Sequence, residues 1–127
     1  MINSIKFKVI LFGLAQTLKI SAKVSTKFAE RLKEKNLIAQ MQIKNESVGR
    51  YFIFENGKVS SKKGIHPNAD VRVIFKTVDV AARLMTPPTD YLEQINAMKT
   101  FQLQAEGDDA LVSWFMETLA IMQNIGA

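Results

Sequence analysis

Hydrophobic residues recur at helical spacing through the first part of the chain. In residues 2–20 they fall three or four positions apart, at Phe7, Ile10, Leu11, Leu14 and Leu18. This spacing predicts an amphipathic helix. A second helix is predicted up to Asn36, with Ser21 or Ser25 as its N-cap, because apolar residues follow four apart at Val24, Phe28 and Leu32. The pattern leaves open whether the two helices are continuous.

The middle of the chain alternates between apolar and polar residues, as strands packed on one face do. Strands are predicted in this way over residues 37–43, 49–55, 58–63, 70–76 and 101–105. In the first of them, one face carries Leu37, Ala39, Met41 and Ile43. Asn56-Gly57 predicts a tight hairpin between the second and third strands, since both residues tolerate positive φ. The third strand has few apolar residues and is expected at or near a sheet edge.

Helical spacing returns around the last strand. A helix over residues 78–85 is predicted to start after Thr77 and to end at Pro87-Pro88. Asp90 and Glu93 have capping-box spacing for a helix through Met98.

The final helix is predicted over residues 110–123, after a turn at Gly107 and a cap at Asp108 or Asp109. Its stripe is Leu111, Trp114, Phe115, Thr118, Leu119 and Met122. The order of elements favours an α+β fold with a roughly five-stranded, mostly antiparallel sheet and helices packed on one face.

Charge separates the first 36 residues from the rest. Residues 1–36 hold eight basic and two acidic residues, a net charge of +6, whereas the remaining residues have a net charge of −1. We therefore distinguish a basic amphipathic helical segment, residues 1–36, from an α+β domain, residues 37–127. Basic and apolar residues together favour docking on an anionic membrane surface or a partner, through Lys6, Lys8, Lys19 and Lys23. The alternative is a helix packed on its own domain with a solvated basic face.

Several other roles are not expected of this first segment. The apolar run of residues 9–18 is too short to span a bilayer, which takes about 20 residues. Lys19 and Lys23 stand where a signal peptide would be small and uncharged. Nucleic-acid binding is not expected, because the segment has no known motif and offers only Phe7, Phe12 and Phe28 for stacking.

Residues that could carry out catalysis are scarce. The chain has no cysteine, which fits a reducing cytoplasm, and His66, before Pro67 in a predicted loop, is its only histidine. One histidine does not make a zinc site, and Asp108-Asp109 is explained by helix capping. The sequence predicts no enzyme activity, no metal site and no cofactor.

The large apolar residues exceed what short helices need in order to pack on a sheet. This surplus consists of Phe101, Trp114, Phe115, Met85, Met98, Met116 and Met122. Met residues fill irregular spaces and adapt to ligands of varied shape. The pattern alone leaves open whether these side chains fill a core or line a cavity.

Three stretches resemble the sterol carrier protein type-2 family. Members of that family open a strand with Ala or Pro followed by Asp-Val, as residues 69–71 do here, and turn into the last helix through Gly-Asp, as Gly107 and Asp108 do. Residues 49–59 resemble the family's central hairpin. The likeness covers residues 37–123.

The resemblance implies an apolar cavity between a twisted five-stranded sheet and its helices. It also implies a non-enzymatic carrier of a sterol, fatty acid, acyl-CoA or similar lipid, which presents the ligand to a membrane or partner enzyme. The ligand would lie between the sheet and the helices of residues 78–98 and 110–123, with the Tyr91 hydroxyl or the Trp114 N–H as polar contacts. The expected wall residues are Phe75, Leu84, Tyr91, Ile95, Met98, Leu103, Trp114, Phe115, Leu119 and Met122.

The alternative is an accessory interaction subunit with a filled cavity, docking through its basic helix. We expect a cytoplasmic protein, peripheral on the membrane if the first segment docks there. The sequence indicates neither the ligand's identity nor the oligomeric state.

Overall fold

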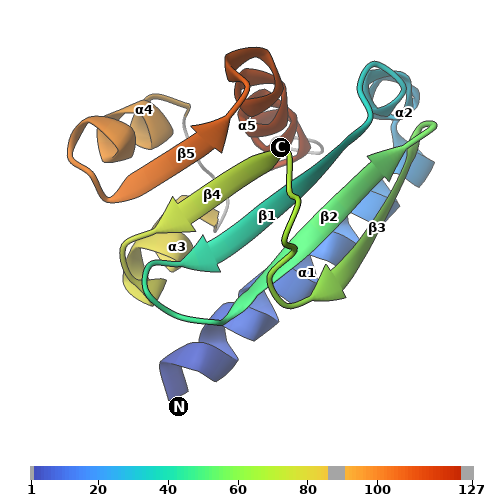
Figure 1. Ribbon diagram of the computed structural model, residues 1–127. Coiled ribbons are helices and arrows are strands. Elements are labelled where there is room, and N and C mark those ends of the chain that lie inside the picture. Colours follow the sequence, from blue (N-terminus) through green and yellow to red (C-terminus); the bar gives the residue numbers. More distant parts are fainter. Residues whose placement is uncertain (1, 86–90, 124–127) are drawn as a thin grey trace.

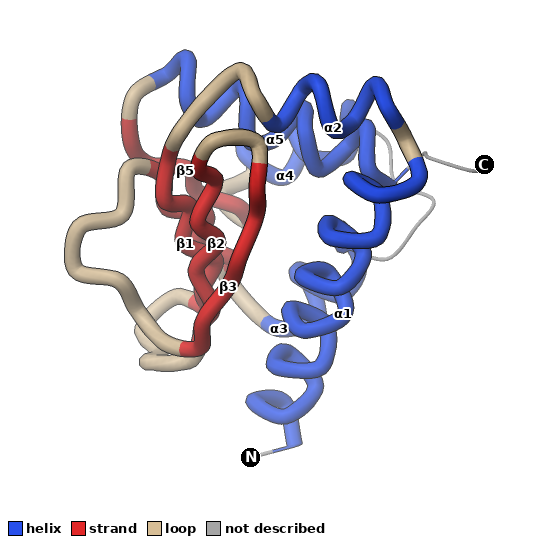
Figure 2. The backbone as a smooth tube through the Cα atoms, turned by 90° about the vertical axis from the view of Figure 1, so that its right-hand side faces the viewer, coloured by secondary structure: helices blue, strands red, loops and turns tan. Residues whose placement is uncertain are grey.

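One sheet with helices on a single face organises the chain (Figures 1 and 2). The computed structural model describes residues 2–85 and 91–123. The elements follow in the order α1 (Ile2–Val24), α2 (Thr26–Leu32), β1 (Leu37–Ile43), β2 (Gly49–Glu55), β3 (Lys58–Lys63), β4 (Val71–Phe75), α3 (Val78–Met85), α4 (Tyr91–Lys99), β5 (Leu103–Gly107) and α5 (Asp109–Gln123). The strand order is β3-β2-β1-β4-β5, in which β1 and β4 are parallel and the other neighbours antiparallel. The predicted α+β fold with a mostly antiparallel sheet is confirmed.

Alternation in the strands sorts side chains between the two faces of the sheet. In β1, the four predicted apolar residues are buried on the helix-covered face, at Leu37, Ala39, Met41 and Ile43. The β2–β3 hairpin turns through Asn56 (φ 54°) and Gly57 (φ 80°), the pair of positive φ angles that the sequence predicts. β3 is an edge strand, as predicted.

Helix α1 runs along the helix-covered face of the sheet (Figure 2). Phe7, Leu11, Leu14 and Leu18 are buried in the common core, which confirms the predicted stripe. Ser25 adopts an extended conformation and its Oγ accepts from the Phe28 N–H (3.2 Å), so α1 and α2 are two helices. The prediction that Val24 shares the apolar face of Phe28 and Leu32 is wrong, because Val24 is 70% exposed.

Phe101 departs from the prediction that it begins the last strand on the buried face. It is 75% exposed, with φ at +60°, and β5 starts at Leu103. The N–H of Gln102 bonds to the carbonyl of Ala97 (2.9 Å) and that of Phe101 to Met98 (3.2 Å). This is a Schellman C-cap of α4 in which Phe101 takes the left-handed position usually filled by Gly. The predicted helix end at Pro87-Pro88 and the cap at Asp90 lie outside the described residues.

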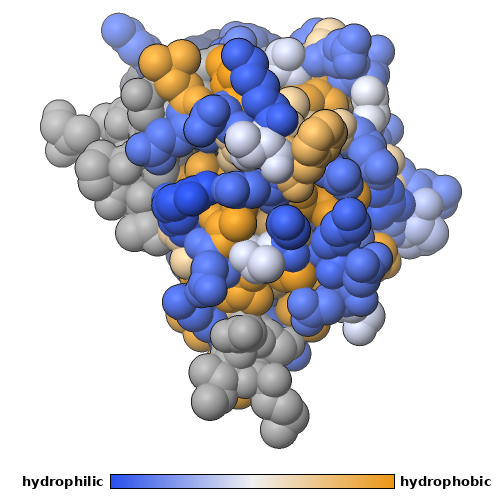
Figure 3. Space-filling model, turned by 90° about the vertical axis from the view of Figure 1, so that its left-hand side faces the viewer, coloured by the Kyte–Doolittle hydropathy of each residue, from blue (hydrophilic) through white to orange (hydrophobic). Residues whose placement is uncertain are grey.

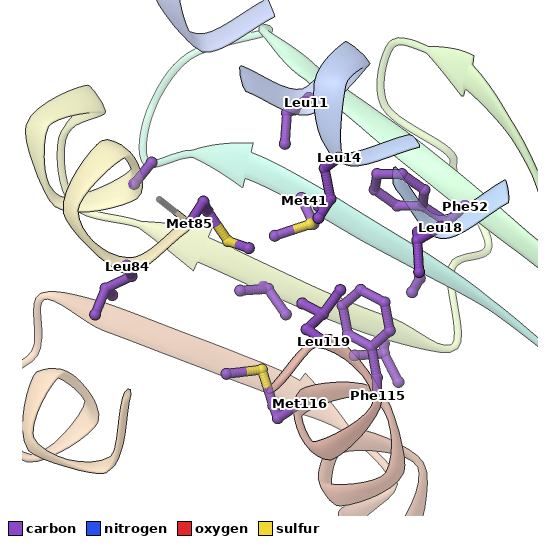
Figure 4. Close-up of a cluster of buried hydrophobic side chains, with 14 of the residues drawn as sticks. Leu11, Leu14, Leu18, Met41, Phe52, Leu84, Met85, Phe115, Met116 and Leu119 are labelled. Carbon is purple, nitrogen blue, oxygen red and sulfur yellow. The ribbon is translucent and has the colours of Figure 1, made fainter. Parts of the chain in front are cut away.

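The core fills the space between sheet and helices (Figure 4). Side chains from α1, α3 and α5 converge there on the strands, as Leu14, Met85, Phe115 and Leu119 do around Met41. Phe115 lies against two aromatic rings of β2, with centroids 6.5 Å from Phe52 and 5.9 Å from Phe54. Most of the surplus large apolar residues noted in the sequence are therefore packed in the core, whereas Met98 and Phe101 are exposed.

Candidate functional site

A groove of about 620 Å³ lies between the first half of α1 and one end of the β2–β3 hairpin. Figure 1 shows that helix beside the start of β2 and the end of β3. The lining from α1 is Ile5, Lys8, Val9, Leu11 and Phe12. The lining from the strands and adjoining turns is Ser47, Val48, Gly49, Arg50, Lys63 and Gly64. Its volume is in the range of small-molecule sites, about 300–1,000 Å³.

Helix α1 carries apolar residues on its exposed side as well as on its buried side, and the exposed ones line the groove. Ile5, Val9 and Phe12 are 61%, 65% and 54% exposed, on turns where the opposite side of the helix is buried in the core. Leu11 is only 1% exposed and contributes to both the core and the groove. The wall formed by α1 is therefore apolar apart from Lys8, and the core begins directly beneath it at Leu11.

Arg50 brings a positive charge to this apolar wall. It alternates with Phe52 and Phe54 along β2, which puts its side chain on the helix-covered face. Its Nη1 donates to Ser61 Oγ (2.7 Å), and its Cζ lies 5.7 Å from the centroid of the Phe12 ring. Lys8 and Lys63 also line the groove, and none of its described lining residues carries a carboxylate. The groove therefore combines apolar walls with positive charge.

The described residues that line the groove include no histidine and no acidic residue. His66 packs on Tyr51, with ring centroids 4.9 Å apart, and its Nδ1 accepts from the Asn68 N–H (3.0 Å). Among the described residues, no group of three or more His, Asp or Glu side chains is placed to hold a metal ion.

The predicted wall residues whose side chains are described lie elsewhere in the fold, and none of these lines the groove. Most are buried in the core, namely Phe75, Leu84, Leu103, Trp114, Phe115, Leu119 and Met122. Ile95 and Met98 of α4 are partly exposed. The side of the molecule on which α4 lies in Figure 1 mixes hydrophobic and hydrophilic residues (Figure 3). The side chain of Tyr91 lies outside the described part of the structure.

The Trp114 indole, expected to contact a ligand through its N–H, contacts residues of α2 and the turn that follows it. Its Nε1 donates to Glu34 Oε1 (3.2 Å), and the Arg31 guanidinium lies over its ring (5.4 Å to the centroid). Arg31 also donates to Thr118 Oγ1 (2.8 Å) and to the Trp114 carbonyl (3.2 Å). These contacts fasten α2 to α5.

The four lysines predicted to dock the chain are exposed along α1. Lys8 lines the groove, and the Nζ of Lys6 lies 3.9 Å from Asp79 of α3, a pair too exposed to contribute much stability. No acidic residue interrupts α1. No helix within the described ranges is long and apolar enough to cross a membrane.

Sequence reasoning missed most of the groove residues, although two signals point to them. The spacing of Ile5, Val9 and Phe12 forms a second apolar stripe beside the buried one. Arg50 occupies the same alternation as Phe52 and Phe54, which places a cation on the core-facing side of the strand. Neither signal shows that α1 meets the β2–β3 hairpin, because that contact joins distant segments.

Comparison with known proteins identifies the fold. No described protein family and no curated protein matches the sequence. The solved structures of a UbiJ-SCP2 ubiquinone synthesis protein match with a TM-score of 0.67 and 18% identity, over 94% of this chain and 96% of that one. The sterol carrier protein domain 2 of Helicoverpa armigera gives a TM-score of 0.61 and 12% identity, covering 90% and 88% of the two chains.

A third similar structure is that of palmitated SCP2L2 from Aedes aegypti, with a TM-score of 0.55 and 18% identity over 84% of this chain and 90% of that one. The chain has the sterol carrier protein type-2 fold, as its strand and turn motifs predict. Identities this low establish the fold alone.

Proposed function

We propose that this chain is a non-enzymatic lipid-binding domain that holds a sterol, fatty acid or acyl-CoA-like ligand and presents it to a membrane or partner enzyme. The observation that most directly supports this proposal is a groove of about 620 Å³ with an apolar wall, on a fold shared with sterol carrier proteins. One protein of this fold is described as palmitated. Burial of apolar ligand surface in the groove would supply the binding free energy.

Within this proposal, the groove is a better ligand site than the space between the sheet and α3–α5. Phe115 and Trp114 occupy that space, and each is in edge contact with Phe54. A ligand there would have to displace packed rings, whereas the groove is already hollow. The ligand chain would lie on Val9 and Phe12, above Leu11.

Presentation of the ligand would rest on α1. Its exposed apolar residues Ile5, Val9, Phe12 and Ile20 lie among Lys6, Lys8, Lys19 and Lys23, a composition suited to an anionic bilayer surface. Since Ile5, Lys8, Val9 and Phe12 also line the groove, its mouth would face the bilayer.

The test is a titration with a fluorescent fatty acid, competed with unlabelled lipid. Val9→Gln with Phe12→Gln should weaken binding about tenfold, because two apolar contacts are worth roughly 1–2 kcal/mol. Ile20→Gln with Val24→Gln is the matched control, since both residues are exposed on the same helix and lie outside the groove. This control should bind like the unaltered protein.

Absence of saturable, competable binding would end the carrier proposal. If the groove variants bind normally while Leu119→Ala changes the affinity, the ligand lies between sheet and helices, as the sequence predicts.

A second candidate is an accessory interaction subunit that docks through its basic helix. The filled core favours it, since Phe115 and Leu119 are 0% and 1% exposed. Native mass spectrometry of protein purified from its own host separates the two: a bound lipid supports the carrier, and a bound protein without lipid supports the accessory subunit.

A further inference from the structure

Two positive charges face each other across the strands that border the groove. Arg50 of β2 is directly opposite Lys63 of β3, and both line the groove with Lys8 of α1. Like charges directly opposite each other destabilise a strand pair. The ion pairs among the described residues are Lys6–Asp79, Arg31–Glu117 and Lys33–Glu30, so no carboxylate in the described part of the chain forms an ion pair with Arg50, Lys63 or Lys8.

Two uncharged groups hold the Arg50 guanidinium in place. Ser61 Oγ accepts one of its N–H groups at 2.7 Å, and the ring of Phe12 lies 5.7 Å from its Cζ. These contacts limit the rotamers of a long side chain, so less entropy is lost when a ligand binds. A guanidinium fixed in this way presents donors that match a carboxylate or phosphate.

Apolar side chains adjoin these cations. Val9 and Phe12 of α1 and Val48 before β2 line the same groove as Arg50. A ligand that satisfies both parts has an anionic head and an apolar chain.

We propose that the groove selects a single-chain amphiphile with a carboxylate or phosphate headgroup. The head accepts hydrogen bonds from Arg50 while Lys8 and Lys63 complete its neutralisation, and the chain lies along Val9, Phe12 and Val48. This inference rests on the proposed lipid-binding function and narrows it. A neutral sterol or alcohol would leave the three cations unmatched, so it binds more weakly.

The experiment compares dodecanoate and dodecyl phosphate with the neutral glyceryl dodecanoate. Each ligand is kept below its own critical micelle concentration, and its affinity is measured by competition with a fluorescent fatty acid. We expect the anionic ligands to bind at least about tenfold more tightly, because hydrogen bonds to charged groups are worth roughly 1.5–3 kcal/mol. The advantage should shrink as salt is added, since Lys8 and Lys63 are exposed.

Arg50→Gln and Lys63→Gln, made separately, should each lower the affinity for the anionic ligands more than the affinity for the neutral ligand, and so reduce this preference. Lys62→Gln is the matched control: it is the neighbouring residue, removes the same charge and points to the other face of β3. Lys63 is exposed, so its variant tests the inference even if Arg50→Gln does not fold.

Equal affinity for the neutral and anionic ligands would overturn the headgroup inference and leave lipid binding intact. Failure of all three ligands to bind would instead overturn the lipid-binding function itself. Competition by inorganic phosphate at the concentrations effective for dodecyl phosphate would show a site for free anions and would also overturn the inference.

Discussion

Gly107 shows how a single residue can fix the end of the sheet. Its φ is +128°, and a Cβ at this position would collide with the backbone carbonyl oxygen of Asp70. Because that neighbour is backbone, a movement of the strand pair would be needed to relieve the collision. The next residue, Asp108, then caps α5 by accepting from the N–H groups of Ala110 (3.0 Å) and Leu111 (3.2 Å).

A pair of glycine substitutions tests this explanation. Gly107→Ala should lower the free energy of unfolding by about 2–4 kcal/mol, from backbone strain and steric collision. Gly13→Ala, in the exposed interior of α1 with open space around the added Cβ, should raise it by about 0.5–1 kcal/mol. Urea unfolding followed by far-UV circular dichroism measures both. If both variants shift stability alike, the proposed strain at Gly107 is absent.

For single residues, the sequence predicts burial correctly where the alternation of apolar and polar residues continues, and incorrectly where a turn interrupts it. Alternation correctly places Met41 in the core and Gln40 on the other face. It fails at Phe101, because the end of α4 uses a Schellman cap and Phe101 fills a position where Gly is expected. Only the hydrogen bonds of the turn show this.

Helix α1 carries apolar residues both on the side that packs in the core and on the side that is exposed to solvent. Its inner stripe includes Phe7, which is fully buried against Phe75 (ring centroids 6.2 Å apart). Its outer side exposes apolar residues at Ile5, Val9, Phe12, Ile20 and Val24. Core packing explains the first set, and a docking surface would explain the second.

Vesicle co-sedimentation tests the docking. At about 1 kcal/mol for each basic residue near an anionic surface, the lysines of α1 should give binding that is strong at low salt and weak at high salt. Changing Lys6, Lys8, Lys19 and Lys23 together to Glu should abolish it. The matched control changes Lys44, Lys58, Lys62 and Lys76, all exposed outside α1, to Glu.

Two results would count against docking. If the control variant loses vesicle binding as completely as the α1 variant does, binding depends on the net charge of the protein and not on the lysines of α1. If the unaltered protein stays in the supernatant with anionic vesicles at every salt concentration, α1 has no membrane role.

At the level of elements, local patterns were sufficient for the helices and strands but not for the site. Residues 78–85 are predicted from Thr77 and the apolar spacing, and α3 has those bounds. The groove depends on α1 lying against the start of β2 and the end of β3, and its lining residues on α1 are roughly 35 to 60 positions along the chain from those on the strands. No periodicity within either segment reports such a contact, so the predicted wall residues came from the resemblance instead.

The molecule as a whole has two apolar regions in which a ligand can be sought. The first is the layer between sheet and helices, where the predicted wall residues are mostly buried. The second is the groove, where apolar side chains are already exposed to solvent. A residue of the packed layer contributes to stability, whereas a residue that lines a ligand site contributes to binding. Substituting one residue of the layer between sheet and helices therefore tests which of these roles that layer has.

Phe115→Ala is that substitution, because Phe115 is fully buried between Phe52 and Phe54 and lies outside the groove. If it is a core residue, the change should lower the free energy of unfolding by about 3–5 kcal/mol and leave fatty-acid affinity unchanged. Phe101→Ala is the control, and it should change stability by less than about 0.5 kcal/mol, since Phe101 is 75% exposed. Urea unfolding and the fluorescent titration give both quantities. A loss of less than about 1 kcal/mol with altered ligand affinity would instead place Phe115 on the wall of a cavity, because a side chain that borders empty space has fewer packing contacts to lose when it is truncated.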